Sequence, residues 1–204
     1  MGTGAHLTTI VLLAGGRATR FPGKLELDVG GEPLLVNTYR RLTKKERPCV
    51  VSVREAPSAA LMSLLPAEFV CDAYVDCGPL GGLASAAAHV RTPLMFAAAA
   101  DMARMDSDTI DELEDCYREI VDKGDAPPDA VVPRWSSGQI EPLAAVYDVL
   151  RFRRGATEAL ARGQRKVAAA FAGLAVRYYD ITREQEERFC NINVPSDLDR
   201  ILAT

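Results

Sequence analysis

Short apolar runs alternate with helix-forming segments along the first 130 residues, and this alternation constrains the fold more than any other feature. Runs rich in Ile, Val, Leu and Ala predict buried strands over 9–14, 49–53, 69–75 and 94–100. Helices are predicted between them, over 33–42, 58–65 and 79–89. Strands joined by helices in this order form right-handed units, with a parallel sheet that helices cover on both faces. The sequence therefore predicts a three-layer α/β fold with a mostly parallel sheet.

The alternation weakens after residue 130, where we expect the sheet to gain an antiparallel or edge element. An acidic amphipathic helix is predicted over 107–123, and a second helix over 148–161. Strands are predicted over 130–132 and 143–147, whereas residues 165–179 show no clear pattern. A last helix is expected over 196–202. The length of the chain fits a single domain over 1–204.

Composition argues against several classes of protein and site. The net charge of −4 argues against a general nucleic-acid binder, which carries a basic surplus. Five cysteines without CxxC spacing, with only two histidines, predict free thiols in a reducing cytoplasm rather than a zinc site. No secretory signal is evident, and the longest apolar stretch, over 93–100, is far shorter than the ~20 residues that cross a bilayer. We therefore expect a cytoplasmic protein without a nucleic-acid or membrane partner.

The residues directly after each predicted strand are the candidates for function, because ligands of such sheets bind at the carboxyl ends of the strands. The first of these segments is Leu13-Ala14-Gly15-Gly16, followed by Arg20 and Lys24. Its glycines let the backbone approach a ligand and point N–H groups at phosphates, and its cations add positive charge. The pattern is neither a Walker A loop nor a dinucleotide fingerprint. A tight turn with solvated charges is the alternative.

Two acidic residues are expected at later strand ends. Asp76 comes after the third predicted strand, and Gly81 and Gly82 follow it in the first turn of a helix. Glycine there is unfavourable, so a flat ring or another backbone is expected to pack close, with ordinary helix–sheet packing as the alternative. Asp101 directly follows the apolar run over 94–100. A carboxylate there suits Mg²⁺, which takes few protein ligands, although capping of the next turn is also possible.

The later half offers weaker signals. Arg134 and Glu141 follow or precede predicted strands, and Asn191 and Asn193 lie near the end of the chain. An Asn side chain both donates and accepts hydrogen bonds, which suits the edge of a heterocycle or a loop backbone. Turn chemistry before Pro195 is the alternative explanation for Asn193.

Together these segments resemble the molybdenum cofactor guanylyltransferases, the MobA-type members of the nucleotidyltransferase superfamily. The resemblance rests on five blocks whose order and spacing also agree: 13–24, 78–82, Asp101, 141–143 and 191–195. It implies a Rossmann-like nucleotidyltransferase fold. It also implies that GMP is transferred from GTP to molybdenum-bound molybdopterin, with release of pyrophosphate. Molybdenum-insertion proteins and acceptor molybdoenzymes are the implied partners.

The resemblance also implies roles for particular residues, carried over by position. Lys24 and Asp101 would be catalytic, and Asp101 would bind Mg²⁺. Ser52 stands where the family usually has Asn. The implied nucleotide contacts are Leu13, Ala14, Gly15, Gly16, Arg20, Lys24, Ser52, Asp76, Gly81 and Asp101. The implied contacts with molybdopterin are Arg134, Glu141, Asn191 and Asn193.

Two other functions remain open at this point. A cytidylyltransferase for molybdopterin, or another nucleotidyltransferase, would share the fold, and physical reasoning on the sequence does not select the base. The double glycine after Ala14 favours the guanylyl group by resemblance. A non-catalytic nucleotide-binding module is the third hypothesis. The presence of both Lys24 and Asp101 weakens it, because binding alone does not require a metal carboxylate.

Overall fold

The computed structural model describes residues 6–15 and 24–192. Its seven strands form one sheet in the order β3-β2-β1-β4-β6-β5-β7. The strands are β1 (Thr8–Leu13), β2 (Cys49–Val53), β3 (Glu68–Cys71), β4 (Leu94–Ala99), β5 (Ala130–Arg134), β6 (Ala144–Asp148) and β7 (Val176–Asp180). Only β6 runs against its neighbours among these strands. The prediction of a mostly parallel sheet with an antiparallel element in the later half is confirmed.

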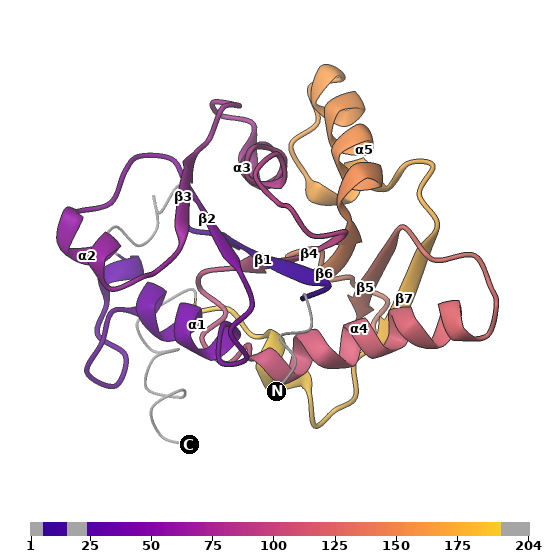
Figure 1. Cartoon of the computed structure of the whole chain (residues 1–204), viewed down its shortest axis with the longest axis horizontal. Helices are drawn as coiled ribbons and strands as arrows, with labels where there is room; N and C mark the ends of the chain where they lie inside the picture. The colour runs from indigo at the N-terminus through magenta and orange to yellow at the C-terminus, as the bar shows by residue number, and fades with distance from the viewer. Residues whose placement is uncertain (1–5, 16–23, 193–204) are drawn as a thin grey trace.

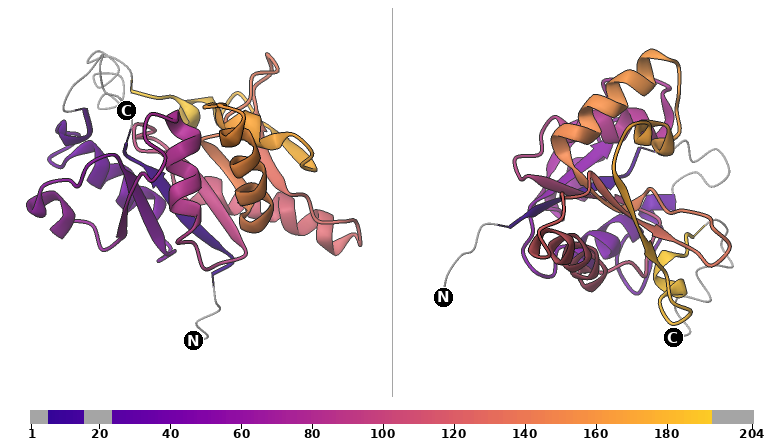
Figure 2. Two further views of the ribbon diagram at one scale, coloured as in Figure 1. Left: turned by 90° about the horizontal axis from the view of Figure 1, so that it is seen from above. Right: turned by 90° about the vertical axis from the view of Figure 1, so that its right-hand side faces the viewer.

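Helices cover both faces of the sheet and complete three layers (Figure 1). The helices are α1 (Leu34–Leu42), α2 (Ala59–Ser63), α3 (Gly78–Ala87), α4 (Ser107–Asp122) and α5 (Val149–Ala161), with short 3-10 turns η1 (Lys24–Glu26), η2 (Val167–Phe171) and η3 (Glu186–Phe189). One face carries α1, α2 and α4, and the opposite face carries α3, α5 and η2. In Figure 2, the right-hand view shows the same layers from the side, and the left-hand view shows α3 and α5 in front of the sheet.

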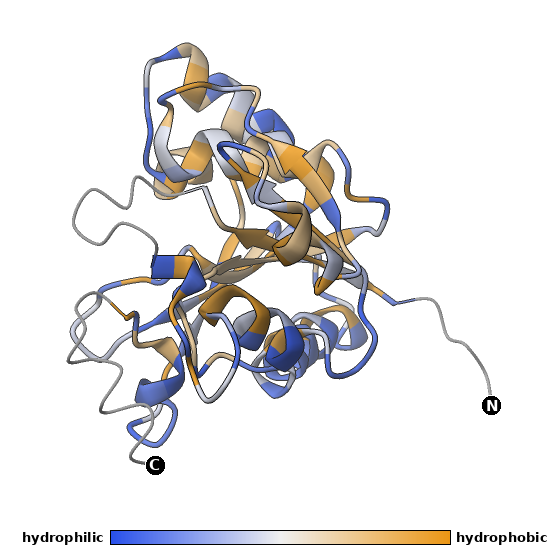
Figure 3. Ribbon diagram, turned by 90° about the vertical axis from the view of Figure 1, so that its left-hand side faces the viewer, coloured by the Kyte–Doolittle hydropathy of each residue, from blue (hydrophilic) through white to orange (hydrophobic). Residues whose placement is uncertain are grey.

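Burial on both faces of the sheet explains why the inner strands β1, β2 and β4 are nearly continuous apolar runs. In β1, Ile10 and Leu12 face one core, and Val11 between them faces the other, as the alternation of side chains along a strand requires. Colouring by hydropathy shows the apolar residues gathered on the strands, whereas the helices carry both apolar and polar sides (Figure 3). None of the helices in the described ranges combines the length and the apolar character needed to cross a membrane.

Two segments differ from the sequence prediction. The third strand ends at Cys71 instead of Val75, because Asp72 makes the last backbone hydrogen bond to β2 and residues 72–77 then turn into α3. The segment over 165–179, which shows no clear pattern in the sequence, contains η2 and the edge strand β7. The predicted last helix over 196–202 lies outside the described residues.

Candidate active site

A cleft of about 980 Å³ lies at the carboxyl-end edge of the sheet. It is bounded by the ends of β1, β2 and β4, by the loop between β3 and α3, and by the segment before β6. Ten of the residues singled out in the sequence line it: Leu13, Ala14, Gly15, Lys24, Ser52, Asp76, Gly82, Asp101, Glu141 and Asn191. Residues from distant parts of the chain therefore meet at one edge of the sheet, as the strand-end argument predicts. Gly16, Arg20 and Asn193 lie outside the described residues.

An ion pair between Lys24 and Asp101 lies near the middle of this edge. The Nζ atom of Lys24 donates a hydrogen bond of 2.6 Å to Oδ2 of Asp101, and the two side chains are only 13% and 26% exposed. Asp101 follows β4, which is paired with β1 on one side and with β6 on the other. The two residues selected as catalytic from the sequence are thus in direct contact, although they are far apart along the chain.

A second polar pair, Ser52 and Asp72, lies on the β2–β3 side of the cleft. The buried Ser52 hydroxyl donates a hydrogen bond of 2.6 Å to Oδ1 of Asp72. A Cβ atom added at Gly82 would lie 2.8 Å from the Ser52 hydroxyl and 3.2 Å from Oδ1 of Asp72. A Cβ atom added at Gly15 would lie 3.1 Å from Oδ2 of Asp72. Both glycines therefore leave room for the Asp72 carboxylate.

Sequence reasoning missed Asp72 and selected Asp76 as the acid at the end of the third strand. The strand ends earlier than predicted, so Asp72 is the acid directly after β3. Asp76 instead lies in the following loop with a positive φ of 58°, and it forms an ion pair of 2.5 Å with Arg54. The low strand propensity of Asp was the available signal that the apolar run is interrupted at position 72.

Gly81 and Arg134 do not line the cleft. A Cβ atom at Gly81 would lie 2.8 Å from Cβ of Cys77 and 2.9 Å from the carbonyl oxygen of Tyr74. Gly81 therefore lets α3 pack against the preceding loop, which confirms the close approach of another backbone. The Arg134 guanidinium lies against β7, where it pairs with Asp180 at 2.8 Å and sits 5.0 Å from the ring centre of Tyr178.

Glu141 is held at the other end of the cleft by a hairpin that precedes β6. Its Oε1 atom accepts hydrogen bonds from Nε1 of Trp135 at 2.6 Å and from Nε2 of Gln139 at 3.3 Å. Burial raises the pKa of Glu141, and these two donors act in the opposite direction. Trp135 in turn contacts Phe189 edge to face, with ring centres 6.3 Å apart.

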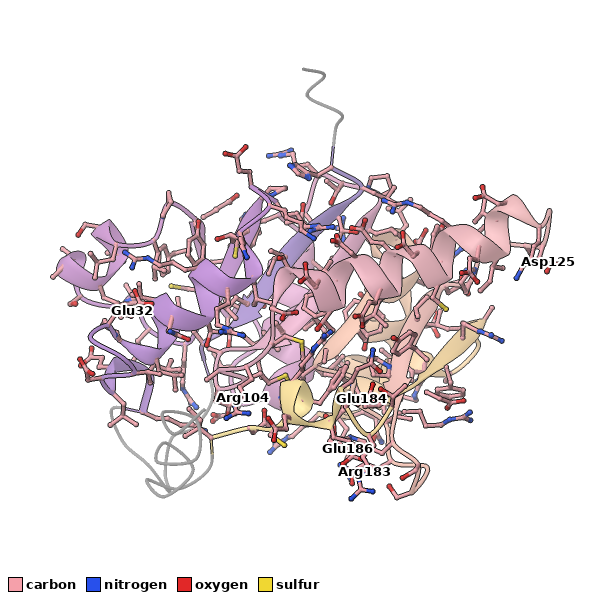
Figure 4. The ribbon with its side chains drawn as sticks, turned by 90° about the horizontal axis from the view of Figure 1, so that it is seen from below. Glu32, Arg104, Asp125, Arg183, Glu184 and Glu186 are labelled. Atoms are coloured by element: carbon pink, nitrogen blue, oxygen red, sulfur yellow. The ribbon has the colours of Figure 1, made fainter. Side chains whose placement is uncertain are left out.

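The segment that follows β7 returns to this edge and brings Asn191 into the cleft. The backbone N–H of Ile192 donates to the carbonyl oxygen of Asp101 at 2.9 Å. Ion pairs also tie the segment to the rest of the fold, between Arg104 and Glu187 and between Arg188 and Glu112. Figure 4 shows Arg104 beside this segment, next to η3.

The donor groups around Asp101 fit a metal ion that shares its ligands with a substrate. In the described parts of the chain, no group of three or more His, Cys, Asp or Glu residues is placed to hold a metal. Mg²⁺ commonly takes one or two protein carboxylates and completes its coordination with phosphate oxygens and water, so the Asp101 carboxylate suits it.

Comparison with known proteins agrees with this geometry. The family profile described as the MobA-like NTP transferase domain matches residues 10–176. The probable molybdenum cofactor guanylyltransferase of Thermococcus kodakarensis is 32% identical over 198 residues, which cover 93% of this chain and 92% of the relative.

Solved structures share the fold. Molybdopterin-guanine dinucleotide biosynthesis protein A from Archaeoglobus fulgidus has a TM-score of 0.74 at 26% identity, covering 96% of this chain and 97% of that one. The 4-diphosphocytidyl-2C-methyl-D-erythritolsynthase of Anaerococcus prevotii has a TM-score of 0.72 at 10% identity, over 97% of both chains, which indicates a common fold alone. On the match of its sequence, supported by its fold, the chain belongs to the MobA-like NTP transferase family.

Proposed function

We propose that this protein transfers GMP from GTP to molybdenum-bound molybdopterin, forming molybdopterin guanine dinucleotide and releasing pyrophosphate. The observation that carries the proposal is the Lys24–Asp101 pair near the middle of a cleft with polar groups on both sides. The similarity to a guanylyltransferase over more than nine-tenths of both chains supports the choice of substrates.

We assign the β1–β2–β3 side of the cleft to the nucleotide. Leu13, Ala14 and Gly15 provide backbone next to the phosphates, and the Ser52–Asp72 pair provides acceptors for the base. A carboxylate can accept hydrogen bonds from both N1–H and the exocyclic amine of guanine. Gly16 and Arg20 remain predicted phosphate contacts. Asp76 and Gly81 would act indirectly, at the rim of the cleft and through the position of α3.

We assign the β4–β6 side to molybdopterin. In the sheet β1 and β4 separate β2 from β6, so at ~4.8 Å per strand the ends of β2 and β6 lie about 14 Å apart. That span can hold a nucleotide and an acceptor side by side over Asp101. Glu141 and Asn191 line this end, and Asn193 remains a predicted contact. Arg134, engaged with Asp180, would contribute only after releasing that partner.

In the reaction, a terminal phosphate oxygen of molybdopterin attacks the α-phosphorus of GTP. A new P–O bond forms, the bond to the bridging oxygen between the α- and β-phosphates breaks, and pyrophosphate leaves with its electrons. Lys24 binds the phosphates and offsets the charge that develops on them, and backbone N–H groups after β1 assist. Mg²⁺ held by Asp101 would supply further charge neutralisation. The rest of the cleft aligns the two substrates, which by itself lowers the barrier substantially.

We also propose that one domain carries both substrate sites and acts in the cytoplasm, a location supported by the five free thiols. Handover of the product would involve molybdenum-insertion proteins and acceptor molybdoenzymes.

The test is a reaction of purified protein with Mg²⁺, GTP and molybdenum-loaded molybdopterin, in which pyrophosphate and dinucleotide are both measured. Equal amounts of the two products are expected. Asp101→Asn should lower the rate about 100-fold in a protein that still folds, because the substitution keeps the shape and an oxygen for Lys24 but removes the charge. Nucleotide binding without any product would instead support a non-catalytic module.

A further inference from the structure

We propose that Glu141 determines specificity for the heterocycle of the second substrate, by accepting an N–H hydrogen bond from its aminopyrimidinone edge on Oε2. This inference rests on the proposed function, which makes that substrate a pterin.

The position of Glu141 places it on the acceptor side of the cleft. It precedes β6, whereas the Ser52–Asp72 pair follows β2 and β3, and Asp101 after β4 lies between these two ends. A nucleotide that spans from Asp72 to Asp101 leaves the Glu141 end of the cleft open. The phosphate of the second substrate must reach the α-phosphorus near Asp101. The ring of that substrate would therefore lie at the Glu141 end.

The Glu141 carboxylate is held in one orientation with one oxygen available. Both donors from the protein, Trp135 and Gln139, bind Oε1. In the described ranges, no hydrogen bond reaches Oε2. The hairpin is itself fixed, because Trp135 N donates to Gln139 O at 2.8 Å and the Trp135 ring packs against Phe189. A side chain supported in this way is preorganised for a ligand.

The chemistry of a half-buried carboxylate selects an N–H donor. A phosphate would be repelled, and an attacking phosphate is largely ionised at neutral pH, so it needs no carboxylate as a base. A pterin offers its 2-amino group and N3–H side by side, and hydrogen bonds to an ionised acceptor are the stronger ones. Burial of Glu141, which also raises its pKa, makes an unfilled acceptor unfavourable. A ring with a carbonyl at the same place should be rejected.

The experiment compares 6-hydroxymethylpterin with 6-hydroxymethyllumazine, in which a carbonyl replaces the 2-amino group. The chain has a single tryptophan, so its one indole ¹⁵N–¹H signal reports on the Trp135–Glu141 hydrogen bond. Titrations contain saturating GTP, which occupies the nucleotide side. We expect the pterin to shift the indole signal and to bind at least 10-fold more tightly than the lumazine.

Variants separate recognition from folding. Glu141→Gln keeps a carbonyl oxygen for Trp135, so it should keep the indole signal, which reports an intact hairpin, yet lose the preference for the pterin. Glu55→Gln is the control, because it removes the same charge from an exposed position elsewhere in the cleft, and the preference should persist.

Three results would overturn the proposal: no pterin preference in the wild type, a preference that survives Glu141→Gln, or a Trp135 shift caused by GTP alone. Pyrophosphate release from GTP and molybdopterin tests the proposed function separately. Turnover without probe discrimination would reject the role of Glu141 alone. Discrimination without turnover would reject the proposed function and leave a pterin-recognising carboxylate.

Discussion

The Lys24–Asp101 ion pair predicts that Lys24 competes with a metal ion for the Asp101 carboxylate. The two side chains are mostly shielded from water, and Nζ lies 2.6 Å from Oδ2. At this distance and an effective dielectric constant of ~20, the gross Coulomb attraction is about 6 kcal/mol. Lost hydration offsets most of it, so the net contribution of such a charged hydrogen bond is roughly 1.5–3 kcal/mol. A metal ion that binds Asp101 in the absence of nucleotide must overcome this amount.

Lys24→Met removes the ammonium group and keeps the length of the stem. The nucleotide-free variant should therefore bind Mn²⁺, a spectroscopic substitute for Mg²⁺, roughly 10- to 100-fold more tightly than the wild type, since 1.4 kcal/mol is a factor of 10. Its affinity for GTP should fall, because Lys24 then no longer binds the phosphates. Electron paramagnetic resonance of free Mn²⁺ measures the first quantity, and calorimetry measures the second.

Lys45→Met is the matched control, since Lys45 pairs with Asp108 and Asp111 on α4, away from the cleft. It should leave both affinities unchanged. Equal Mn²⁺ affinities in the wild type and Lys24→Met would refute the reasoning, because they would mean that the ion pair does not limit access to Asp101 in solution.

Three further predictions concern other parts of the structure. Asp72→Asn should weaken GTP binding at least 10-fold in calorimetry, because one carboxylate acceptor for the base is replaced by an amide; unchanged affinity would remove Asp72 from base recognition. Burial raises the pKa of Glu141 in the folded state. The protonated carboxyl group therefore contributes favourably to the free energy of unfolding at low pH, and this contribution is lost as pH rises through the folded-state pKa. The melting temperature of Glu141→Gln should therefore rise relative to that of the wild type as pH increases. A difference between the two melting temperatures that does not change with pH would contradict this. Gly81→Ala should cost about 1–3 kcal/mol in urea unfolding, because its Cβ would lie 2.9 Å from Tyr74 O; wild-type stability would show that the loop yields freely.

The sequence predicts β1, β2 and β4 because each is an apolar run buried on both faces. The same logic fails for β7, which lies at the edge of the sheet and exposes much of Val-Arg-Tyr-Tyr-Asp to water. The charged and exposed residues of β7 interrupt the apolar run that marks the inner strands.

The candidate site shows the same division. The convergence of Lys24 and Asp101 follows from strand order, since the carboxyl ends of the parallel strands β1 and β4 share one edge. Glu141 reaches the same edge because it precedes β6, which runs antiparallel to β4. Strand order does not decide whether Asp72 or Asp76 enters the site, because that depends on the residue at which β3 ends. The ion pair of Arg134 with Asp180 on β7 could not be predicted either, because β7 itself shows no clear pattern in the sequence.

The most direct test of guanylyl transfer compares GTP with CTP and ATP under identical conditions, with molybdenum-loaded molybdopterin as the acceptor. We expect kcat/KM for GTP to exceed that for either competitor at least 10-fold, a difference of about 1.4 kcal/mol, because the other bases leave acceptors placed for guanine donors unpaired. A value for CTP equal to or above that for GTP would contradict the guanylyl assignment and support cytidylyl transfer on the same fold.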